Sequence, residues 1–297
     1  MMGPAPPLGR LESPPPLTRS EARSFARLVR QWRALGADAM DWAVLGLPRE
    51  AGRPGGIDGF FESGEEVLRS IEADVGKIGL SLRGGRALDF GCGPGRFTRA
   101  LARRYAAVVG VDVSEGMVAL ARSLNAREER LSFEWNESSD LAPLGSRRFD
   151  LVFSAYVLQH LPDWLATRYL REFSRVLVPN GILVVQDHGH PVRRWMRKIP
   201  PRWIYGPLNW SRRRGAPRGS APLEARWDDY WIPPGAMHRI LERAGLQLRS
   251  TAPDPKPDGR LVSYWYVAQK SAREASLEGD PRPPRAAGSG PSGAGGR

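Results

Sequence analysis

The chain has 297 residues, a formal net charge of +12 at pH 7 and a single cysteine, Cys92. One cysteine excludes an intrachain disulfide and any metal site built from several thiolates, and it fits a reducing compartment. No apolar run reaches the ~18 residues that a membrane-spanning helix needs, and the start of the chain lacks the apolar region of a signal peptide. We therefore expect a cytoplasmic protein.

Both ends of the chain have a biased composition. Residues 1–18 are rich in proline, and residues 271–297 in glycine, proline and serine. Such segments bury too little apolar surface to offset the entropy of ordering, so we predict two disordered tails. The roughly 250 residues between them suffice for one substantial core.

Residues 19–83 are predicted to form an N-terminal helical cap. Apolar residues recur at helical spacing over 22–35, and Ser63 with Glu66 matches a capping box that would start another helix. We expect the aromatic residues of this region, Trp32 among them, to pack against the core. A role as a lid over a ligand is the alternative.

Strand and helix patterns alternate over residues 84–270. The predicted strands cover 87–90, 107–112, 131–135, 149–154, 182–185, 246–250 and 261–268, and the predicted helices include 95–105, with Tyr105 on its apolar face, and 235–244. Further helices are expected after Ser114 and from Asp163, the latter ending before Pro179. This alternation predicts an α/β fold: a doubly wound, seven-stranded, mostly parallel sheet with helices on both faces.

A glycine-rich turn lies between the first strand and its helix. Gly91, Gly93 and Gly95 would let the backbone turn sharply and approach a ligand at the N-terminus of the helix. Asp89, two residues before the first glycine, would repel a pyrophosphate and suit an ammonium group. The turn therefore predicts a zwitterionic cofactor without phosphate.

Asp112 ends the second predicted strand. At the carboxyl end of a strand in such a sheet, a carboxylate can accept hydrogen bonds from a ribose diol. Capping of the helix that begins after Ser114 is the alternative role.

Four stretches in this order resemble motifs of the class I S-adenosylmethionine-dependent methyltransferases. They are residues 88–95 (LDFGCGPG), 109–117 (VGVDVSEGM), 149–162 (FDLVFSAYVLQHLP) and 175–181 (RVLVPNG). The resemblance is strong over about residues 84–190. It implies a Rossmann-like fold, S-adenosyl-L-methionine as the cofactor and methyl transfer as the reaction.

The resemblance also implies a set of cofactor-binding residues. Asp112 would hold the ribose, while Val113 and Met117 would pack on the adenine; Met117 could equally belong to the core. Asn136 and Glu137 occupy the third-motif region, where the sequence departs from the family's glycine-aspartate pair. The full set is Asp89, Gly91, Cys92, Gly93, Gly95, Arg96, Asp112, Val113, Met117, Asn136, Glu137 and Ser154.

Two histidines follow the fourth and fifth predicted strands, where groups that act on the acceptor should stand. His160 and His188 are the candidate catalytic residues, and His160 would act as a base or orient the acceptor. The structural alternatives for His160 are capping of the Asp163 helix region and bracing of a loop. His188 and His190 lack a third ligand nearby, so no metal site is predicted. The candidate substrate-binding residues are Tyr156, Gln159, Arg193, Arg194 and Trp195.

Residues 191–223 hold nine basic residues, no acidic one and several interleaved aromatic residues. The segment follows the fifth strand, on the side where an acceptor should enter. It suits an anionic acceptor, such as a phosphorylated or lipid-linked glycan, or a peripheral contact with a membrane. RNA binding is a further alternative, and a solvated insertion is the structural one.

We therefore predict methyl transfer to a small-molecule, glycan or lipid-linked acceptor, at oxygen rather than at a ring nitrogen. The stretch Ser154-Ala-Tyr156 does not match the signature of nucleobase amino methylation, and no cysteine stands there for attack on a pyrimidine. These absences disfavour nucleobases. An RNA-directed methyltransferase and a non-catalytic cofactor-binding protein are the alternatives, and the oligomeric state is not indicated.

Overall fold

A computed structural model describes residues 14–38, 56–144, 149–191, 230–254 and 261–272. Its strands are β1 (Gly84–Phe90), β2 (Tyr105–Asp112), β3 (Leu131–Trp135), β4 (Phe149–Ser154), β5 (Leu177–Pro191), β6 (Leu246–Pro253) and β7 (Leu261–Lys270). Its helices are α1 (Arg19–Asp38), α3 (Gly56–Lys77), α4 (Arg96–Leu101), α5 (Glu115–Leu124), α6 (Asp163–Val176) and α8 (Pro234–Arg243), with short 3-10 helices η1 (Ala142–Leu144) and η2 (Leu158–His160).

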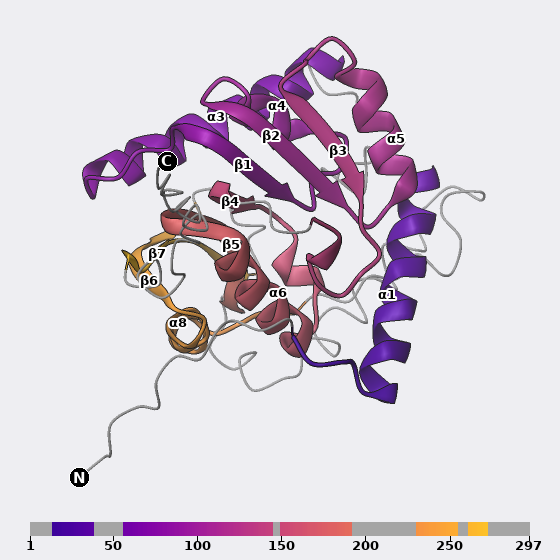
Figure 1. Cartoon of the computed structure of the whole chain (residues 1–297), viewed down its shortest axis with the longest axis vertical. Coiled ribbons are helices and arrows are strands. Elements are labelled where there is room, and N and C mark those ends of the chain that lie inside the picture. The colour runs from indigo at the N-terminus through magenta and orange to yellow at the C-terminus, as the bar shows by residue number, and fades with distance from the viewer. Residues whose placement is uncertain (1–13, 39–55, 145–148, 192–229, 255–260, 273–297) are drawn as a thin grey trace, which may run out of the picture.

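The strands form one sheet in the order β3-β2-β1-β4-β5-β7-β6 (Figure 1). β7 is antiparallel to both of its neighbours, and the other pairs are parallel. The predicted doubly wound, mostly parallel, seven-stranded sheet is confirmed. The chain order reverses between β1 and β4, and ligands of such sheets bind at this point, beyond the carboxyl ends of the strands.

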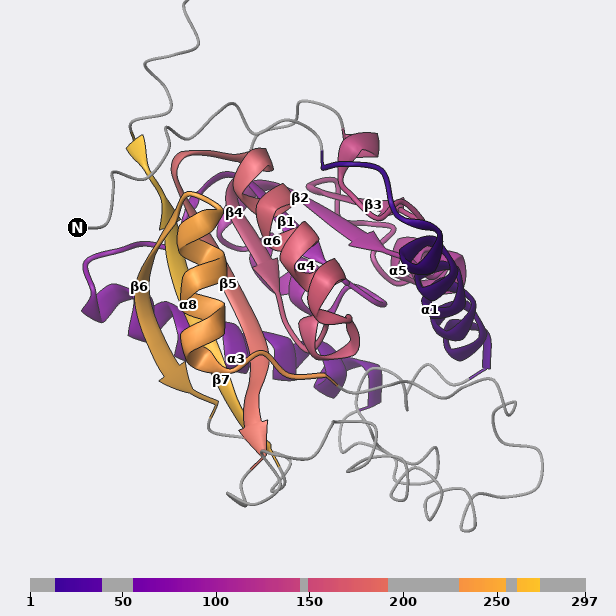
Figure 2. The ribbon, with the colours of Figure 1, turned by 90° about the horizontal axis from the view of Figure 1, so that it is seen from below.

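Helices cover both faces of the sheet, with α6 and α8 on one face and α3 on the other (Figure 2). Successive side chains of a strand point to opposite faces, so Leu88 and Leu183 pack on the side of α6 and α8. Ala87 and Val184 instead pack with α3 and α4. Because both faces are covered, the strands read as apolar runs and are open to a ligand only at their ends.

Two predicted boundaries around β1 and α4 are wrong. Tyr105 does not lie on the helix; it is the first residue of β2, because α4 ends at Leu101. β1 begins at Gly84, earlier than predicted, because pairing with β2 extends it to that residue. The sequence gives no apolar signal for this extension, since residues 84–86 are exposed.

The predicted capping box at Ser63 and Glu66 is also wrong. Both residues lie inside α3, which begins at Gly56, and the Ser63 hydroxyl donates to the carbonyl oxygen of Phe60 at 2.6 Å. Burial of Phe60 and Phe61 extends the helix past the apparent start signal. A local cap pattern is thus overridden by tertiary packing.

α1 lies beside α5 (Figure 1). An added Cβ at Gly36 would lie 2.0 Å from the Ser114 Oγ, so the end of α1 touches the start of α5 closely. The division into a cap over 19–83 and a methyltransferase domain over 84–270 stays a prediction. Apart from residues 14–18 and 271–272, the predicted tails lie outside the described residues.

Candidate active site

A pocket opens at the carboxyl ends of β1, β2 and β4, with α1 as one wall. Its lining brings together many of the predicted site residues: Gly91, Cys92, Gly93, Arg96, Asp112, Val113, Met117, Asn136, Tyr156 and His160. Other predicted residues lie outside that lining: Asp89, Gly95, Glu137, Ser154, Gln159 and His188. The substrate candidates Arg193, Arg194 and Trp195 fall outside the described residues.

The glycine turn after β1 forms the floor of the pocket. Gly91, Gly93 and Gly95 all have positive φ angles, of 75°, 51° and 92°, which favour glycine. At Gly91 a side chain is also excluded by space, because an added Cβ would lie 2.3 Å from the Cγ2 of Val157. The loop after β4 therefore packs directly on the glycine turn.

Asp112, the last residue of β2, ties this turn to the next helix. Its Oδ2 accepts a hydrogen bond from the Gly93 amide at 2.9 Å, and its Oδ1 accepts one from the Ser114 amide at 2.8 Å. The Ser114 hydroxyl in turn caps α5. Burial raises the pKa of Asp112, and the hydrogen bonds from the backbone amides partly oppose this rise. Asp112 thus lines the pocket and also organises its backbone, so both predicted roles fit its position.

Asp89 lies beneath the glycine turn and not in the pocket lining. It is 2% exposed, and the Thr98 hydroxyl of α4 donates to its Oδ2 at 2.6 Å. Burial raises the pKa of Asp89 to about 7, and the nearby charge of Asp112 contributes to the rise. The protonation of this buried carboxyl therefore changes near neutral pH.

Cys92 is a packing residue of the turn. The Cys92 Sγ lies close to Gly110, where an added Cβ would be only 3.0 Å from it. The Cys92 side chain also packs in a small apolar cluster with Phe133. Burial raises the pKa of the Cys92 thiol well above its usual value. A thiol held protonated in this way is a poor nucleophile.

Arg96 begins α4 and lines the pocket, although it is largely buried. Its Nε donates to the Ser63 Oγ at 3.0 Å and its Nη2 to the Ser63 carbonyl oxygen at 3.2 Å. Ser63, which the sequence suggested as a helix cap, therefore holds this arginine in place.

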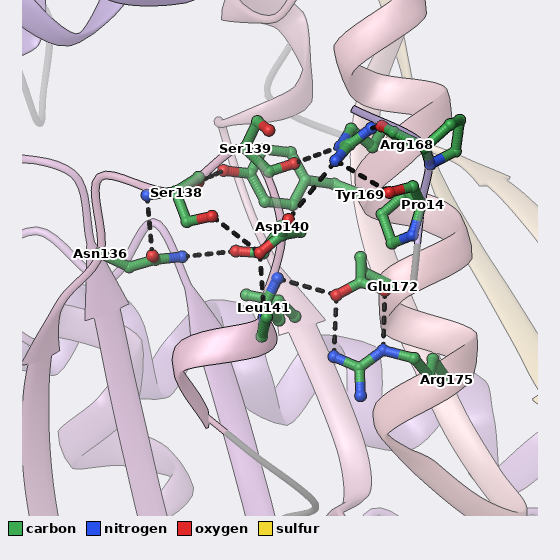
Figure 3. Close-up of polar contacts among 12 residues, drawn as sticks. Pro14, Asn136, Ser138, Ser139, Asp140, Leu141, Arg168, Tyr169, Glu172 and Arg175 are labelled. Atoms are coloured by element: carbon green, nitrogen blue, oxygen red, sulfur yellow. Dashed lines mark hydrogen bonds and ion pairs between the residues drawn. The ribbon is translucent and has the colours of Figure 1, made fainter. Parts of the chain in front are cut away.

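The loop after β3 reaches the pocket through Asn136. Figure 3 shows the polar contacts of this loop. The Asn136 Oδ1 accepts from the Ser138 amide, and its Nδ2 donates to the Asp140 carbonyl oxygen, both at 2.9 Å. The Asn136 side chain thus shapes the loop itself. Glu137 lies outside the lining and forms an ion pair with Arg33 of α1 at 2.8 Å.

The loop after β4 contributes Tyr156, Val157 and His160 to the pocket. Tyr156 has a left-handed backbone with a φ of 62°, and its amide donates to the Oε1 of the buried Gln186 at 3.1 Å. A non-glycine residue in this conformation is uncommon and is held by its surroundings. Ser154 lies beneath the loop, where its hydroxyl donates to the Phe90 carbonyl oxygen at 3.0 Å.

The two candidate histidines have different surroundings. The His160 ring lies 5.0 Å from the Trp32 ring of α1, and its Nε2 is 3.3 Å from the Gln159 Nε2. His188 lies outside the pocket, buried in β5, with its Nδ1 2.8 Å from the Ser263 Oγ of β7. The structure brings only His160 to the pocket.

Sequence reasoning missed several apolar residues of the pocket. These come from α1 and from the region of α6: Phe25, Leu28, Leu161, Leu165 and Tyr169. Trp32, considered as either packing or lid, also lines the pocket and contacts His160. The one relevant signal in the sequence is that α1 is amphipathic, which does not identify what its apolar face covers.

Comparisons with known proteins show the family of this chain. Residues 88–185 match a methyltransferase domain family. Over 263 residues the chain is 31% identical to the ubiquinone biosynthesis O-methyltransferase of Azorhizobium caulinodans, covering 85% of this chain and 92% of that protein. Over 143 residues it is 36% identical to the trans-aconitate 2-methyltransferase of an Azoarcus species, covering 46% of this chain and 51% of that protein.

Solved structures show the same fold. An S-adenosylmethionine-dependent methyltransferase of Leishmania major aligns with a TM-score of 0.56 at 19% identity, covering 83% of this chain and 82% of that one. Magnesium protoporphyrin IX methyltransferase of Synechocystis, solved with S-adenosylmethionine bound, aligns with a TM-score of 0.50 at 18% identity, covering 85% and 96%.

The sheet order and the glycine turn define a Rossmann-like methyltransferase fold, as predicted. The chain belongs to the S-adenosylmethionine-dependent methyltransferases, and S-adenosylmethionine is its cofactor. The pocket fits this molecule because Gly91 and Gly93 present backbone without side chains and Asp112 supplies a carboxylate beside the apolar Val113 and Met117. No helix among the described residues has the length and apolar character to cross a membrane.

The raised pKa of Asp89 leads to a pH-dependent prediction. If S-adenosylhomocysteine binds beside the glycine turn, as the family resemblance implies, an ionised Asp89 would attract its ammonium group, and protonation below about pH 7 would remove that attraction. We expect the affinity for S-adenosylhomocysteine to fall roughly tenfold between pH 8 and pH 6, following the ionised fraction. Calorimetry across this range measures it. Asp89→Asn should give weaker binding that hardly varies with pH, and an unchanged slope in that variant would contradict the prediction.

Proposed function

We propose that this enzyme methylates a hydroxyl oxygen of a small-molecule acceptor, with His160 as the general base. The observation that carries the proposal is the position of His160, which lines the pocket directly after β4. The apolar pocket residues Leu161 and Leu165 follow it in the chain, and Trp32 contacts its ring. Such walls suit an acceptor with an apolar or aromatic body. The name of the Azorhizobium relative, an O-methyltransferase, supports oxygen as the acceptor atom.

We further propose how the chain holds its cofactor. The backbone of Gly91 and Gly93 and the side chain of Arg96 would lie along the methionine part, with Asp89 supplying negative charge from beneath. Asp112 would hold the ribose, and Val113 and Met117 would pack against the adenine. Bound in this way, S-adenosylmethionine supplies an electrophilic methyl group on its sulfonium.

The residues of the chain then prepare the acceptor. His160 takes the proton from the acceptor hydroxyl as the oxygen becomes nucleophilic. Trp32 and the loop after β4 restrict the orientation of the His160 ring. The surrounding apolar side chains exclude water and keep the acceptor oxygen in line, which is the main requirement of a displacement reaction.

An acceptor panel tests the proposal. We expect a labelled methyl group to be transferred to phenols or alcohols with an apolar body, and not to matched amines. Trans-aconitate, after which the Azoarcus relative is named, serves as a carboxylate acceptor. Mass spectrometry identifies the methylated atom. Exclusive methylation of amines would refute oxygen methylation, and exclusive methylation of carboxylates would refute a hydroxyl acceptor. An anionic, glycan or lipid-linked acceptor and a membrane contact through 191–223 remain predictions, because almost all of that segment lies outside the described residues.

A further inference from the structure

The loop over residues 136–141 is fastened to α6 by side chains on one face of that helix (Figure 3). The Arg168 Nε donates to the Ser139 carbonyl oxygen at 2.9 Å. The Tyr169 hydroxyl donates to the Ser138 carbonyl oxygen at 2.7 Å. Tyr169 and the start of the loop both line the pocket. The position of α6 therefore decides the shape of the pocket on this side.

Arg168 also binds the segment that leads into α1. Its Nη1 donates to the Pro15 carbonyl oxygen and its Nη2 to that of Pro14, while the Asp140 carboxylate lies 3.4 Å from the Nη2. Its side chain is only 11% exposed, so most of its donors must be satisfied by these protein groups. One guanidinium thus joins the loop and the N-terminal segment.

The joined segment continues without a break into α1. Thr18 and Glu21 form a capping box: the Glu21 carboxylate accepts from the Thr18 amide at 2.8 Å, and the Glu21 amide donates to the Thr18 hydroxyl at 3.3 Å. The backbone of Pro14 and Pro15 is therefore connected, through this capped start, to the helix that carries Leu28 and Trp32 into the pocket.

A second arginine fastens α1 to the same loop. Arg33, toward the other end of α1, forms an ion pair with Glu137 at 2.8 Å, and its guanidinium lies 4.9 Å from the centre of the Trp135 ring. The loop is thus tied to α1 near both ends of the helix. The Arg33 pair is more exposed, so Arg168 is the stronger of the two ties.

We propose that Arg168 is a positioning residue that couples cofactor binding to the closure of α1 over the pocket. When the cofactor orders the loop over 136–141, the loop holds Arg168, and Arg168 holds the segment before α1. The helix then keeps Trp32 against His160. By reciprocity, an α1 held in place strengthens cofactor binding. The inference rests on the cofactor occupying the pocket as proposed above, and not on the identity of the acceptor.

Hydrogen exchange with the full-length protein tests the coupling. In the wild type, saturating S-adenosylhomocysteine should slow amide exchange in residues 19–35. In Arg168→Gln this slowing should shrink, and the affinity for S-adenosylhomocysteine should fall, each by about fivefold or more, because the two effects share one coupling free energy. Arg168→Lys should give an intermediate result, since it keeps the charge and loses the planar fork.

Arg171→Gln is the matched control, because Arg171 is exposed on the same helix; it should behave as the wild type. The proposal is overturned if Arg168→Gln shows the wild-type slowing of α1, or if exchange in β1 and β4 rises as much as in α1, which would indicate a merely structural role. If the wild type methylates hydroxyls but S-adenosylhomocysteine does not slow exchange in α1, the coupling fails and the proposed function stands. If exchange in α1 is slowed but no hydroxyl is methylated, the proposed function fails and the coupling stands.

Discussion

His160→Gln should lower kcat for a hydroxyl acceptor by about 10²–10⁴-fold, the usual contribution of a positioned general base. Glutamine has a similar size but cannot accept the proton. The affinity for S-adenosylhomocysteine should change little, because the proposed cofactor contacts lie on the glycine turn and beyond β2. Single-turnover assays at saturating cofactor, combined with calorimetry, measure the two quantities separately.

Two further variants make this result specific. His160→Phe keeps a ring against Trp32, so it should retain the local packing and still lose kcat. His238→Gln, on the exposed side of α8, is the matched control and should leave kcat unchanged. If His160→Gln turned over at the wild-type rate while losing stability, His160 would brace the loop after β4 and not act as a base.

Gly91→Ala should lower the free energy of unfolding by about 2–5 kcal/mol, the sum of a strained backbone and an overpacked contact. The positive φ of 75° disfavours alanine, and its Cβ would meet the Val157 Cγ2 at 2.3 Å. Relief of this clash would move the glycine turn or the loop after β4, so binding of S-adenosylhomocysteine should also be lost. Urea unfolding and calorimetry measure both effects.

A double variant separates the two causes of this loss. Adding Val157→Ala removes the two closest contacts, those with Cγ2 and Cγ1, and leaves the backbone strain and a Cβ at 3.2 Å, so Gly91→Ala with Val157→Ala should recover part of the stability. Gly235→Ala is the control: its added Cβ meets only the Arg239 Nη1 at an ordinary 3.7 Å, and its cost should be small. No recovery in the double variant would show that strain alone, and not the contact with Val157, requires glycine at position 91.

Much of the fold could be predicted because its signals are local. Buried strands such as β4 are apolar runs, and Ser114 caps α5 as expected. The failures occurred where local signals compete with packing. Ser63 looked like a helix start but lies within α3, and Tyr105 looked like the end of a helix but begins β2. In each case burial against a distant element decided the outcome.

The candidate site divides in the same way. The three glycines of the turn and the two acids, Asp89 and Asp112, lie in two short stretches of the chain, and their spacing is enough to predict the cofactor. The proposed cofactor contacts involve the backbone of one turn and the end of the neighbouring strand. The sequence alone could therefore predict that the glycine turn and Asp112 lie at the pocket, whereas Asp89 and Gly95 lie outside its lining.

Only the tertiary structure shows that His160 and not His188 lines the pocket, and that α1 supplies one of the pocket walls. β4 ends at Ser154, and the loop that follows carries His160 to the pocket. β5 instead continues to Pro191 beside β7, so His188 stays within the sheet. Strand length depends on the partner strand, which lies far away in the chain. For the same reason the amphipathic pattern of α1 could not identify what the helix covers. That follows from contacts between Trp32 and His160, and between Arg168 and Pro15, across more than a hundred residues.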